Sequence, residues 1–204
     1  MADTALSLEH LAPGLGDPVH ESQAVFRVLL DTLSRPGTVG RVSPVLDVQG
    51  PLAHVPDAAF AALLTLADYA TPLWLQRHDA ALAATLRFHT GAPMADHARN
   101  AAFAYIDDAA AMTAPESFAL GDPETPDRAA TLLIRVEALD GGRPLVLRGP
   151  GIESSITIAP LGLPDAFWPA RAALAPAFPC GIDCYLVCGT AMIGIPRTTL
   201  VEMN

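Results

Sequence analysis

The alternation of helices with strands is clearest in residues 57–106, which read DAAFAALLTLADYATPLWLQRHDAALAATLRFHTGAPMADHARNAAFAYI. Apolar residues recur at helical spacing in two parts of this segment, and each part is followed by a short apolar run typical of a buried strand. The segment thus predicts a helix over Asp57 to Ala67 capped by Asp57, a strand over Pro72 to Gln76, a helix over Asp79 to Phe88 that Gly91 ends, and a strand over Ala101 to Ile106.

The chain before this segment predicts one long helix and one short strand. Residues 1–16 contain two glycines and a proline near their end, and we expect them to form an N-terminal arm. Asp17 precedes Pro18 in the order of an N-cap and a first helical residue, and apolar residues then recur at helical spacing as far as Pro36. Thr38 to Val42 predicts a strand, and a connection follows over Pro44 to Pro56.

The second half of the chain predicts hairpins. TLLIRVEAL and RPLVLRG flank Asp140-Gly141-Gly142, which is the strongest short turn signal in the sequence. The acidic stretch GDPETPD at 121–127 is expected to be a surface loop, Pro164 to Ala175 an alanine-rich helix, and DCYLVCG and MIGIP the last strands around a tight turn at Gly189. Helices that alternate with strands and then give way to hairpins favour a three-layer α/β/α fold with a mixed sheet, in a single domain over 1–204.

The charge composition excludes several classes of protein. The 204 residues include 12 Lys and Arg against 22 Asp and Glu, and all twelve cations are arginine. Without lysine the chain cannot be a pyridoxal-phosphate enzyme, a Schiff-base aldolase or a Walker-type nucleotide-binding protein. A net charge of −10 without a basic run also argues against nucleic-acid binding.

Neither a secretory signal nor a membrane span is expected. The N-terminus has no basic flank with an apolar stretch behind it, and the apolar run from Ala58 to Ala67 is too short for a bilayer. We therefore expect a cytoplasmic protein. Cys180, Cys184 and Cys188 lack the spacing and the histidine partners of a zinc or redox site. We interpret Cys184 and Cys188 as small buried apolar residues on one face of the strand IDCYLVCG.

Generic catalytic and metal-binding motifs are missing from the sequence, so two local clusters become the candidate ligand-binding sites. No two histidines have metal-ligand spacing, and we expect no metal and no cofactor. In RFHTGAP at 87–93, Arg87 and His89 stand at the end of a predicted helix. They either offset the negative end of the helix dipole or form an anion-binding corner.

The second cluster is IPRTT at 195–199, where Arg197 and Thr198 supply donors that suit phosphate or phosphonate oxygens. The alternative is a structural arginine with neighbouring strand residues. Two carboxylates, Asp68 and Asp183, stand at element boundaries. Each could pair with an arginine, act as a base or cap the backbone.

Five segments together resemble the PhnH family of the carbon-phosphorus lyase system, in order and in spacing. They are HESQAVFRVLLDTLSRPG at 20–37, LLTLADYATPLWL at 63–75, LRFHTGAP at 86–93, TLLIRVEALDGGRPLVLRGPGI at 131–152 and FPCGIDCYLVCGTAMIGIPRTT at 178–199. The resemblance covers nearly the whole chain. Its motifs are long but chemically plain, and it leaves the catalytic residues unknown.

The resemblance implies a role in organophosphonate catabolism. PhnH acts with the subunits PhnG, PhnI and PhnL to replace the adenine of ATP by an alkylphosphonate, and PhnJ later cleaves the carbon-phosphorus bond. The family fold is similar to the large domain of pyridoxal-phosphate-dependent transferases, without the cofactor. The expected function is thus a non-autonomous subunit of a transferase assembly.

Two other functions stay open: a stand-alone enzyme that acts on a small phosphorylated metabolite, and a structural scaffold that only shapes its partners. A phosphonate or a nucleotide is the expected ligand. The isolated chain is expected to be a homodimer, because fold relatives pair and because apolar helices such as Ala58 to Ala67 must be covered.

Overall fold

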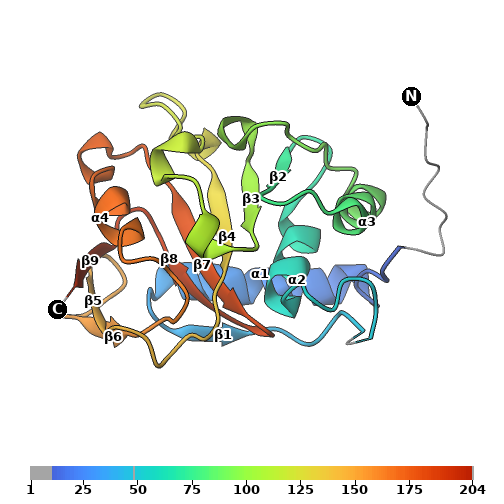
Figure 1. Ribbon diagram of the computed structural model, residues 1–204, viewed down its shortest axis with the longest axis horizontal. Helices are drawn as coiled ribbons and strands as arrows, with labels where there is room; N and C mark the ends of the chain where they lie inside the picture. The colour runs from blue at the N-terminus through green and yellow to red at the C-terminus, as the bar shows by residue number, and fades with distance from the viewer. Residues whose placement is uncertain (1–10, 48, 204) are drawn as a thin grey trace.

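The computed structural model describes residues 11–47 and 49–203, which form four α-helices, five short 3₁₀ helices and nine strands (Figure 1). The helices are α1 (Pro18–Ser34), α2 (Asp57–Leu66), α3 (Ala80–Thr90) and α4 (Phe167–Ala172). The strands are β1 (Val39–Arg41), β2 (Leu73–Leu75), β3 (Phe103–Ile106), β4 (Thr131–Arg135), β5 (Leu145–Arg148), β6 (Ile156–Ile158), β7 (Asp183–Cys188), β8 (Ala191–Ile195) and β9 (Leu200–Met203).

Six strands form the larger sheet, in the order β1-β8-β7-β4-β3-β2. The strands β2, β3, β4 and β7 are parallel to one another, whereas β8 is antiparallel to both β7 and β1. All strands of this sheet except β8 therefore run in one direction. The predicted α/β class and the mixed sheet are confirmed.

Side chains alternate between the two faces of this sheet, so that each face joins its own hydrophobic core. Tyr105 and Leu133 point into the core that lies under α1, α2 and α3. Leu132 and Ile134 point into the second core, together with Trp168 of α4. Three helices thus cover the first face, and the second face is covered by α4 and the small antiparallel sheet β6-β5-β9 (Figure 1).

The predicted ends of α1 and α3 are confirmed by their caps. The Asp17 side chain accepts from the N–H groups of Val19 and His20 at the start of α1. At α3, the Asp79 side chain accepts from Leu82 N at 2.9 Å. Gly91 ends that helix with a φ of 72°, a left-handed conformation that glycine adopts without strain.

The prediction that Asp57 caps α2 is wrong. Asp57 is the first residue of the helix, and its Oδ1 accepts from the backbone N–H groups of Val45 at 2.7 Å and Leu46 at 2.8 Å. The carboxylate thus fixes the connection that precedes the helix. Residues 58–63 of α2 are buried in the core with α1 and α3, so the apolar helix offered as a reason for dimerisation is already covered within the chain.

The predicted hairpin over residues 131–149 is also wrong, because its two strands belong to different sheets. A turn does form at Asp140-Gly141, but β4 pairs with β3 and β7 while β5 pairs with β6 and β9. Leu132, Leu133 and Ile134 are all fully buried. A strand that is apolar on both faces is typical of the middle of a parallel sheet, and that preference outweighed the local turn signal.

Most of the remaining elements follow the prediction, but β6 and β9 were not predicted, so MIGIP is not the last strand. The strands β7 and β8 form the expected hairpin, with Gly189 in its turn at a φ of 54°. Cys184 is fully buried in the second core, as predicted, whereas Cys188 at the end of β7 is only partly buried, so the prediction of burial is wrong for Cys188. The last helix is shorter than predicted at both ends, since it covers Phe167–Ala172 and not Pro164 to Ala175; at its carboxyl end, Pro176 has no N–H with which to continue it.

The helix α1 crosses β8 at close range, and a glycine allows it. A Cβ atom on Gly194 would lie 2.7 Å from the backbone carbonyl of Thr32 in α1. No side chain can occupy that position unless the helix moves. Gly194 therefore sets the distance between α1 and the sheet.

The predicted N-terminal arm is described only in part, because residues 1–10 lie outside the described residues. Ala12 is buried, and its N–H donates to Oγ1 of Thr85 in α3 at 3.2 Å. The described end of the arm thus packs against α3. In the part of the chain that the structure describes, no helix is long and apolar enough to cross a membrane.

Candidate functional site

The main cleft of the molecule lies where the parallel strands end. Its volume is about 630 Å³, and Arg77, Asp107, Arg135 and Cys188 line it. These residues follow or end β2, β3, β4 and β7 respectively. In open α/β sheets, ligands bind in the crevice outside the carboxyl ends of the strands. The cleft therefore occupies the position at which this class of fold binds its ligands.

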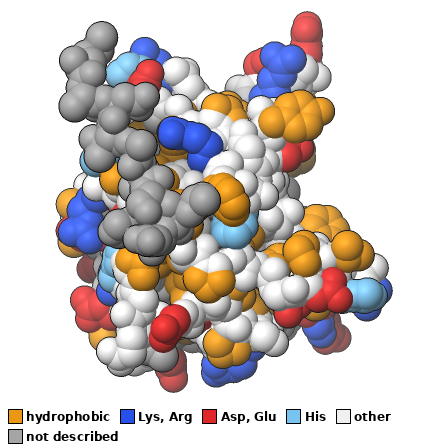
Figure 2. All heavy atoms as spheres, turned by 90° about the vertical axis from the view of Figure 1, so that its right-hand side faces the viewer, with side chains coloured by type: hydrophobic (Ala, Val, Ile, Leu, Met, Phe, Trp, Pro, Cys, Tyr) orange, Lys and Arg blue, Asp and Glu red, His pale blue; other side chains and the backbone are white. Residues whose placement is uncertain are grey.

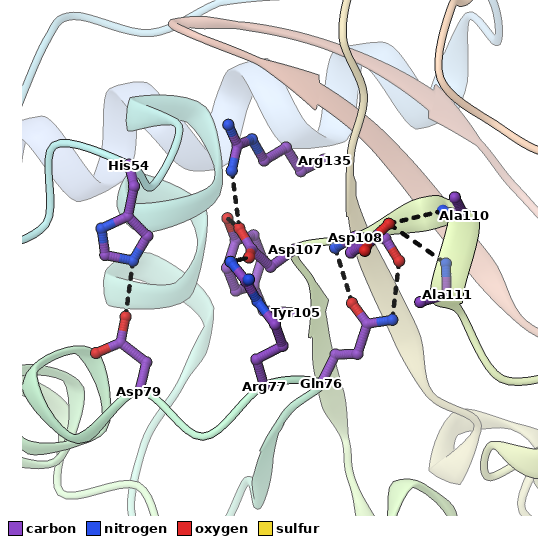
Figure 3. Close-up of polar contacts among 10 residues, drawn as sticks. All are labelled: His54, Gln76, Arg77, Asp79, Tyr105, Asp107, Asp108, Ala110, Ala111 and Arg135. Carbon is purple, nitrogen blue, oxygen red and sulfur yellow. Dashed lines mark hydrogen bonds and ion pairs between the residues drawn. The ribbon is translucent and has the colours of Figure 1, made fainter.

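A pair of side-chain contacts ties the ends of β2 and β3 together. Gln76 donates from Nε2 to the carbonyl oxygen of Asp108 at 2.8 Å, and its Oε1 accepts from Asp108 N, also at 2.8 Å. The next residue after Gln76 is Arg77, and the residue before Asp108 is Asp107. This reciprocal contact holds Arg77 and Asp107 side by side at the mouth of the cleft (Figure 3).

Asp107 lies at the centre of the polar cluster shown in Figure 3. It forms an ion pair with Arg77 and accepts from Nη1 of Arg135 at 3.0 Å and from the Tyr105 hydroxyl at 3.3 Å. The Asp107 side chain is 8% exposed, whereas those of Arg77 and Arg135 are 65% and 42% exposed. A buried carboxylate thus anchors two guanidinium groups that remain open to the cleft.

The protonation states in this cluster follow from burial and from the two arginines. Burial by itself raises the pKa of Asp107, but hydrogen bonds from Arg135 and Arg77 outweigh it and hold the pKa below its usual value. Burial, together with the charge of Asp107, raises the pKa of the Tyr105 hydroxyl. At neutral pH, Asp107 is a carboxylate and Tyr105 is a neutral donor.

A histidine and an aspartate form the wall opposite this cluster (Figure 3). His54 Nε2 lies 2.8 Å from Oδ2 of Asp79, whose other carboxylate oxygen caps α3. A second cavity of about 330 Å³ is lined by His54, Arg77, Asp79 and Asp107, so it adjoins the main cleft. His54 thus contributes an imidazole ring to this side of the cleft, and the Nδ1 atom of the ring is directed away from Asp79.

Two of the other acidic residues of the cleft accept hydrogen bonds from backbone N–H groups. Asp57 accepts from two N–H groups of the preceding connection, and Asp108 accepts from Ala110 N at 3.1 Å and Ala111 N at 3.3 Å. Glu137 stands exposed at the rim. Within residues 11–47 and 49–203, no three His, Cys, Asp or Glu side chains are grouped so that they could hold a metal ion. The chemistry that the cleft offers is hydrogen bonding from guanidinium groups.

The first predicted cluster lies away from the cleft, near the amino ends of the parallel strands. Arg87 and His89 occupy the last turn of α3, and the chain then returns to the start of β2, where Leu73 N donates to Pro93 O at 2.9 Å. His89 donates from Nε2 to the carbonyl oxygen of Ala12 at 3.0 Å and so holds the arm. Figure 2 views this side of the molecule, where charged and apolar side chains are interspersed outside the grey atoms.

The second predicted cluster also lies at the amino ends of the parallel strands. Asp183 begins β7, and Arg197 follows β8 beside it. Arg197 donates to both carboxylate oxygens of Asp183, at 2.6 Å from Nη2, and from Nη1 to the carbonyl oxygens of Pro126 and Pro179. The structure thus places Arg197 and Asp183 in an ion pair that joins three segments of the chain.

The last two candidates have local surroundings. Thr198 is partly buried next to Arg197. Asp68 Oδ1 accepts from Ala70 N at 2.9 Å, and Asp68 N donates to Oγ1 of Thr71 at 2.7 Å. Asp68 therefore fixes the turn after α2, as the capping alternative expects.

The residues of the cleft were missed because they follow strands without forming a motif. RHD follows the predicted strand PLWLQ, DD follows AAFAYI, and arginine ends TLLIR. The signal that could have identified them is a charged residue at the carboxyl end of three successive strands. Its use requires knowing that these strands are parallel neighbours.

Comparison with known proteins identifies relatives over most of the chain. Residues 13–202 match the family model described as "Bacterial phosphonate metabolism protein (PhnH)". A protein of Rhizobium meliloti (strain 1021), "Alpha-D-ribose 1-methylphosphonate 5-triphosphate synthase subunit PhnH", is 45% identical over 188 residues, 91% of this chain and 92% of the relative. A protein of Stutzerimonas stutzeri, "Putative C-P lyase subunit protein HtxG", is 31% identical over 182 residues, 89% of this chain and 86% of the relative.

Proposed function

Because the chain belongs to the PhnH family of bacterial phosphonate metabolism proteins, we propose that it is a non-autonomous subunit of the carbon-phosphorus lyase system. In this role it is needed, with partner subunits, for the transfer of the ribose triphosphate moiety of ATP to an alkylphosphonate. The observation that carries the proposal is the 45% identity, over 91% of the chain, to a subunit of ribose 1-methylphosphonate 5-triphosphate synthase.

The reaction proposed for the assembly is a pentosyl transfer. The N-glycosidic bond of ATP breaks, a phosphonate oxygen bonds to C1′ of the ribose, and adenine leaves with a proton. Both reactants carry tetrahedral oxyanions, and an arginine-lined cleft at the carboxyl ends of parallel strands suits such groups. We propose PhnG-, PhnI-, PhnJ- and PhnL-like subunits as partners and the cytoplasm as the compartment.

Reconstitution tests this function. The purified partner subunits are incubated with ATP and methylphosphonate, with and without the chain, and adenine release is measured by chromatography. Release should require the chain and return when it is added back. Full release without the chain would contradict the proposal, and turnover by the chain alone would indicate a stand-alone enzyme.

We propose, second, that the isolated chain is a homodimer. The support comes from α1, whose outer side carries the exposed residues Val19, Phe26 and Leu30. Their i, i+7 and i+11 spacing places them on one side of the helix. Light scattering at tens of micromolar should return twice the chain mass, and Phe26→Asp should halve it. A monomer mass for the unmodified chain would overturn this proposal.

We propose, third, a kinship of the larger sheet with the large domain of pyridoxal-phosphate-dependent transferases. The support is a mixed sheet in which only β8 runs against the other strands, with three helices on one face. The chain has no lysine to hold the cofactor. An experimental structure whose sheet order differs from that of those enzymes would contradict the kinship.

A further inference from the structure

The two arginines of the cleft use only a small part of their hydrogen-bonding capacity. A guanidinium group carries five N–H donors. Arg77 contacts Asp107 through Nη2, and Arg135 contacts it through Nη1. No protein acceptor for their other nitrogen atoms is found among the described residues. Several donors on each side chain are therefore open to the cleft.

The placement of these donors favours an anion over water alone. Asp107 holds both guanidinium groups on one carboxylate, so that two positive charges face a single buried negative charge. Asp57 and Asp108 are occupied by backbone N–H groups, and Asp79 by His54 and the start of α3. These carboxylates keep their negative charge, as does Glu137 at the rim, so an anion would be attracted by the open guanidinium N–H groups and not by the net charge of the lining.

We propose that this cleft binds the tetrahedral phosphate or phosphonate group of a small substrate, with oxygen atoms that accept from both Arg77 and Arg135. This inference rests on the proposed function, which supplies two molecules with such a group: the alkylphosphonate and the triphosphate of ATP. The cleft of about 630 Å³ is in the range of small-molecule sites and exceeds the needs of methylphosphonate alone.

His54 indicates the direction in which the rest of the ligand lies. The adjoining cavity of about 330 Å³ extends from Arg77 to His54, which is fixed by Asp79. A group attached to the anchored oxyanion would extend along this wall, within reach of the imidazole. A nucleotide would contact both arginines and His54, whereas methylphosphonate would contact the arginines alone.

The test is direct binding to the full chain. Isothermal titration at low ionic strength measures methylphosphonate, ATP and adenosine as separate probes. Methylphosphonate or ATP should bind, adenosine should not, and Arg77→Ala and Arg135→Ala should each weaken binding at least tenfold, as expected for the loss of a charge-assisted contact. Arg99→Ala, at an exposed position before the start of β3, is the matched control and should bind as the unmodified chain does.

The probes also separate the two sources of the anion. Tighter binding of methylphosphonate assigns the cleft to the phosphonate. Tighter binding of ATP, with a loss of affinity in His54→Ala, assigns it to the triphosphate. Arg77→Gln and Arg135→Gln, with thermal melts, control for folding.

The proposal is overturned if the unmodified chain binds neither probe, or if the arginine variants bind as tightly as the Arg99→Ala control. These outcomes are independent of the reconstitution assay, which measures adenine release with and without the chain. A chain that binds no anion can still be required for turnover. A chain that binds an anion can still prove dispensable.

Discussion

Replacing Arg197 by alanine should destabilise the fold strongly, although Arg197 lies outside the cleft. Its side chain is 17% exposed and that of its partner Asp183 is 19% exposed, so water screens the pair only weakly. The substitution leaves that carboxylate, together with the carbonyl oxygens of Pro126 and Pro179, without the guanidinium donor. Breaking a buried ion pair from one side costs about 3 kcal/mol or more.

For a chain of this length, each kcal/mol lowers Tm by about 2–4 °C, so Arg197→Ala should lower it by about 6–12 °C. Differential scanning calorimetry measures the shift, and Arg87→Ala is the control because Arg87 is exposed on α3. In the reconstituted complex, activity per folded molecule should stay unchanged for Arg197→Ala. An unchanged Tm combined with lost activity would refute the reasoning and return Arg197 to the ligand-binding residues.

Three further predictions concern the packing of α1 on the sheet, the stability of the fold at low pH and the reactivity of the cysteines. Gly194→Ala should prevent α1 from packing against the sheet, because the added Cβ would lie 2.7 Å from the helix backbone. Unfolding in urea should then no longer be cooperative. A cooperative transition like that of the unmodified chain would show that α1 can shift at low cost. The lowered pKa of Asp107 contributes stability that is present above the usual carboxyl value of 3.8 and is lost as pH falls below it. Urea titrations from pH 3 to 6 should therefore show a steeper acid loss for the unmodified chain than for Asp107→Asn, and parallel curves would contradict this. Burial raises the pKa of the Cys184 thiol to about 11. Iodoacetamide at pH 8 should therefore modify the partly buried Cys180 and Cys188 before Cys184, as mass spectrometry would show. Early modification of Cys184 would contradict its burial.

Local signals in the sequence were sufficient for most elements but not for strand pairing. Asp17 with Pro18, and Asp79 with Gly91, define helix ends through contacts within a few residues, so their prediction needs no knowledge of the fold. The partners of β4 are set by its burial between two strands, one of which lies some fifty residues further along the chain. The local turn at Asp140 carries no information about that choice.

The same limit explains the candidate site. Arg197 and Asp183 were correctly expected at the ends of strands, but they lie at the amino ends of the parallel strands, away from the cleft. Arg77, Asp107 and Arg135 come together only because β2, β3 and β4 are parallel neighbours. Neither strand direction nor strand order can be read from one short apolar run.

The pairing of β1 with β8 has a consequence for biosynthesis. The strand β1 and the helix before it pack against a strand formed by residues 191–195, some 150 residues further along the chain. The helix α1 can pack against α2 as soon as both have been made, but β1 has no partner strand until β8 is made, and a contact between such distant residues forms slowly. During synthesis β1 should therefore stay an unpaired strand until β8 has left the ribosome, and a premature stop before β8 should yield an aggregating fragment.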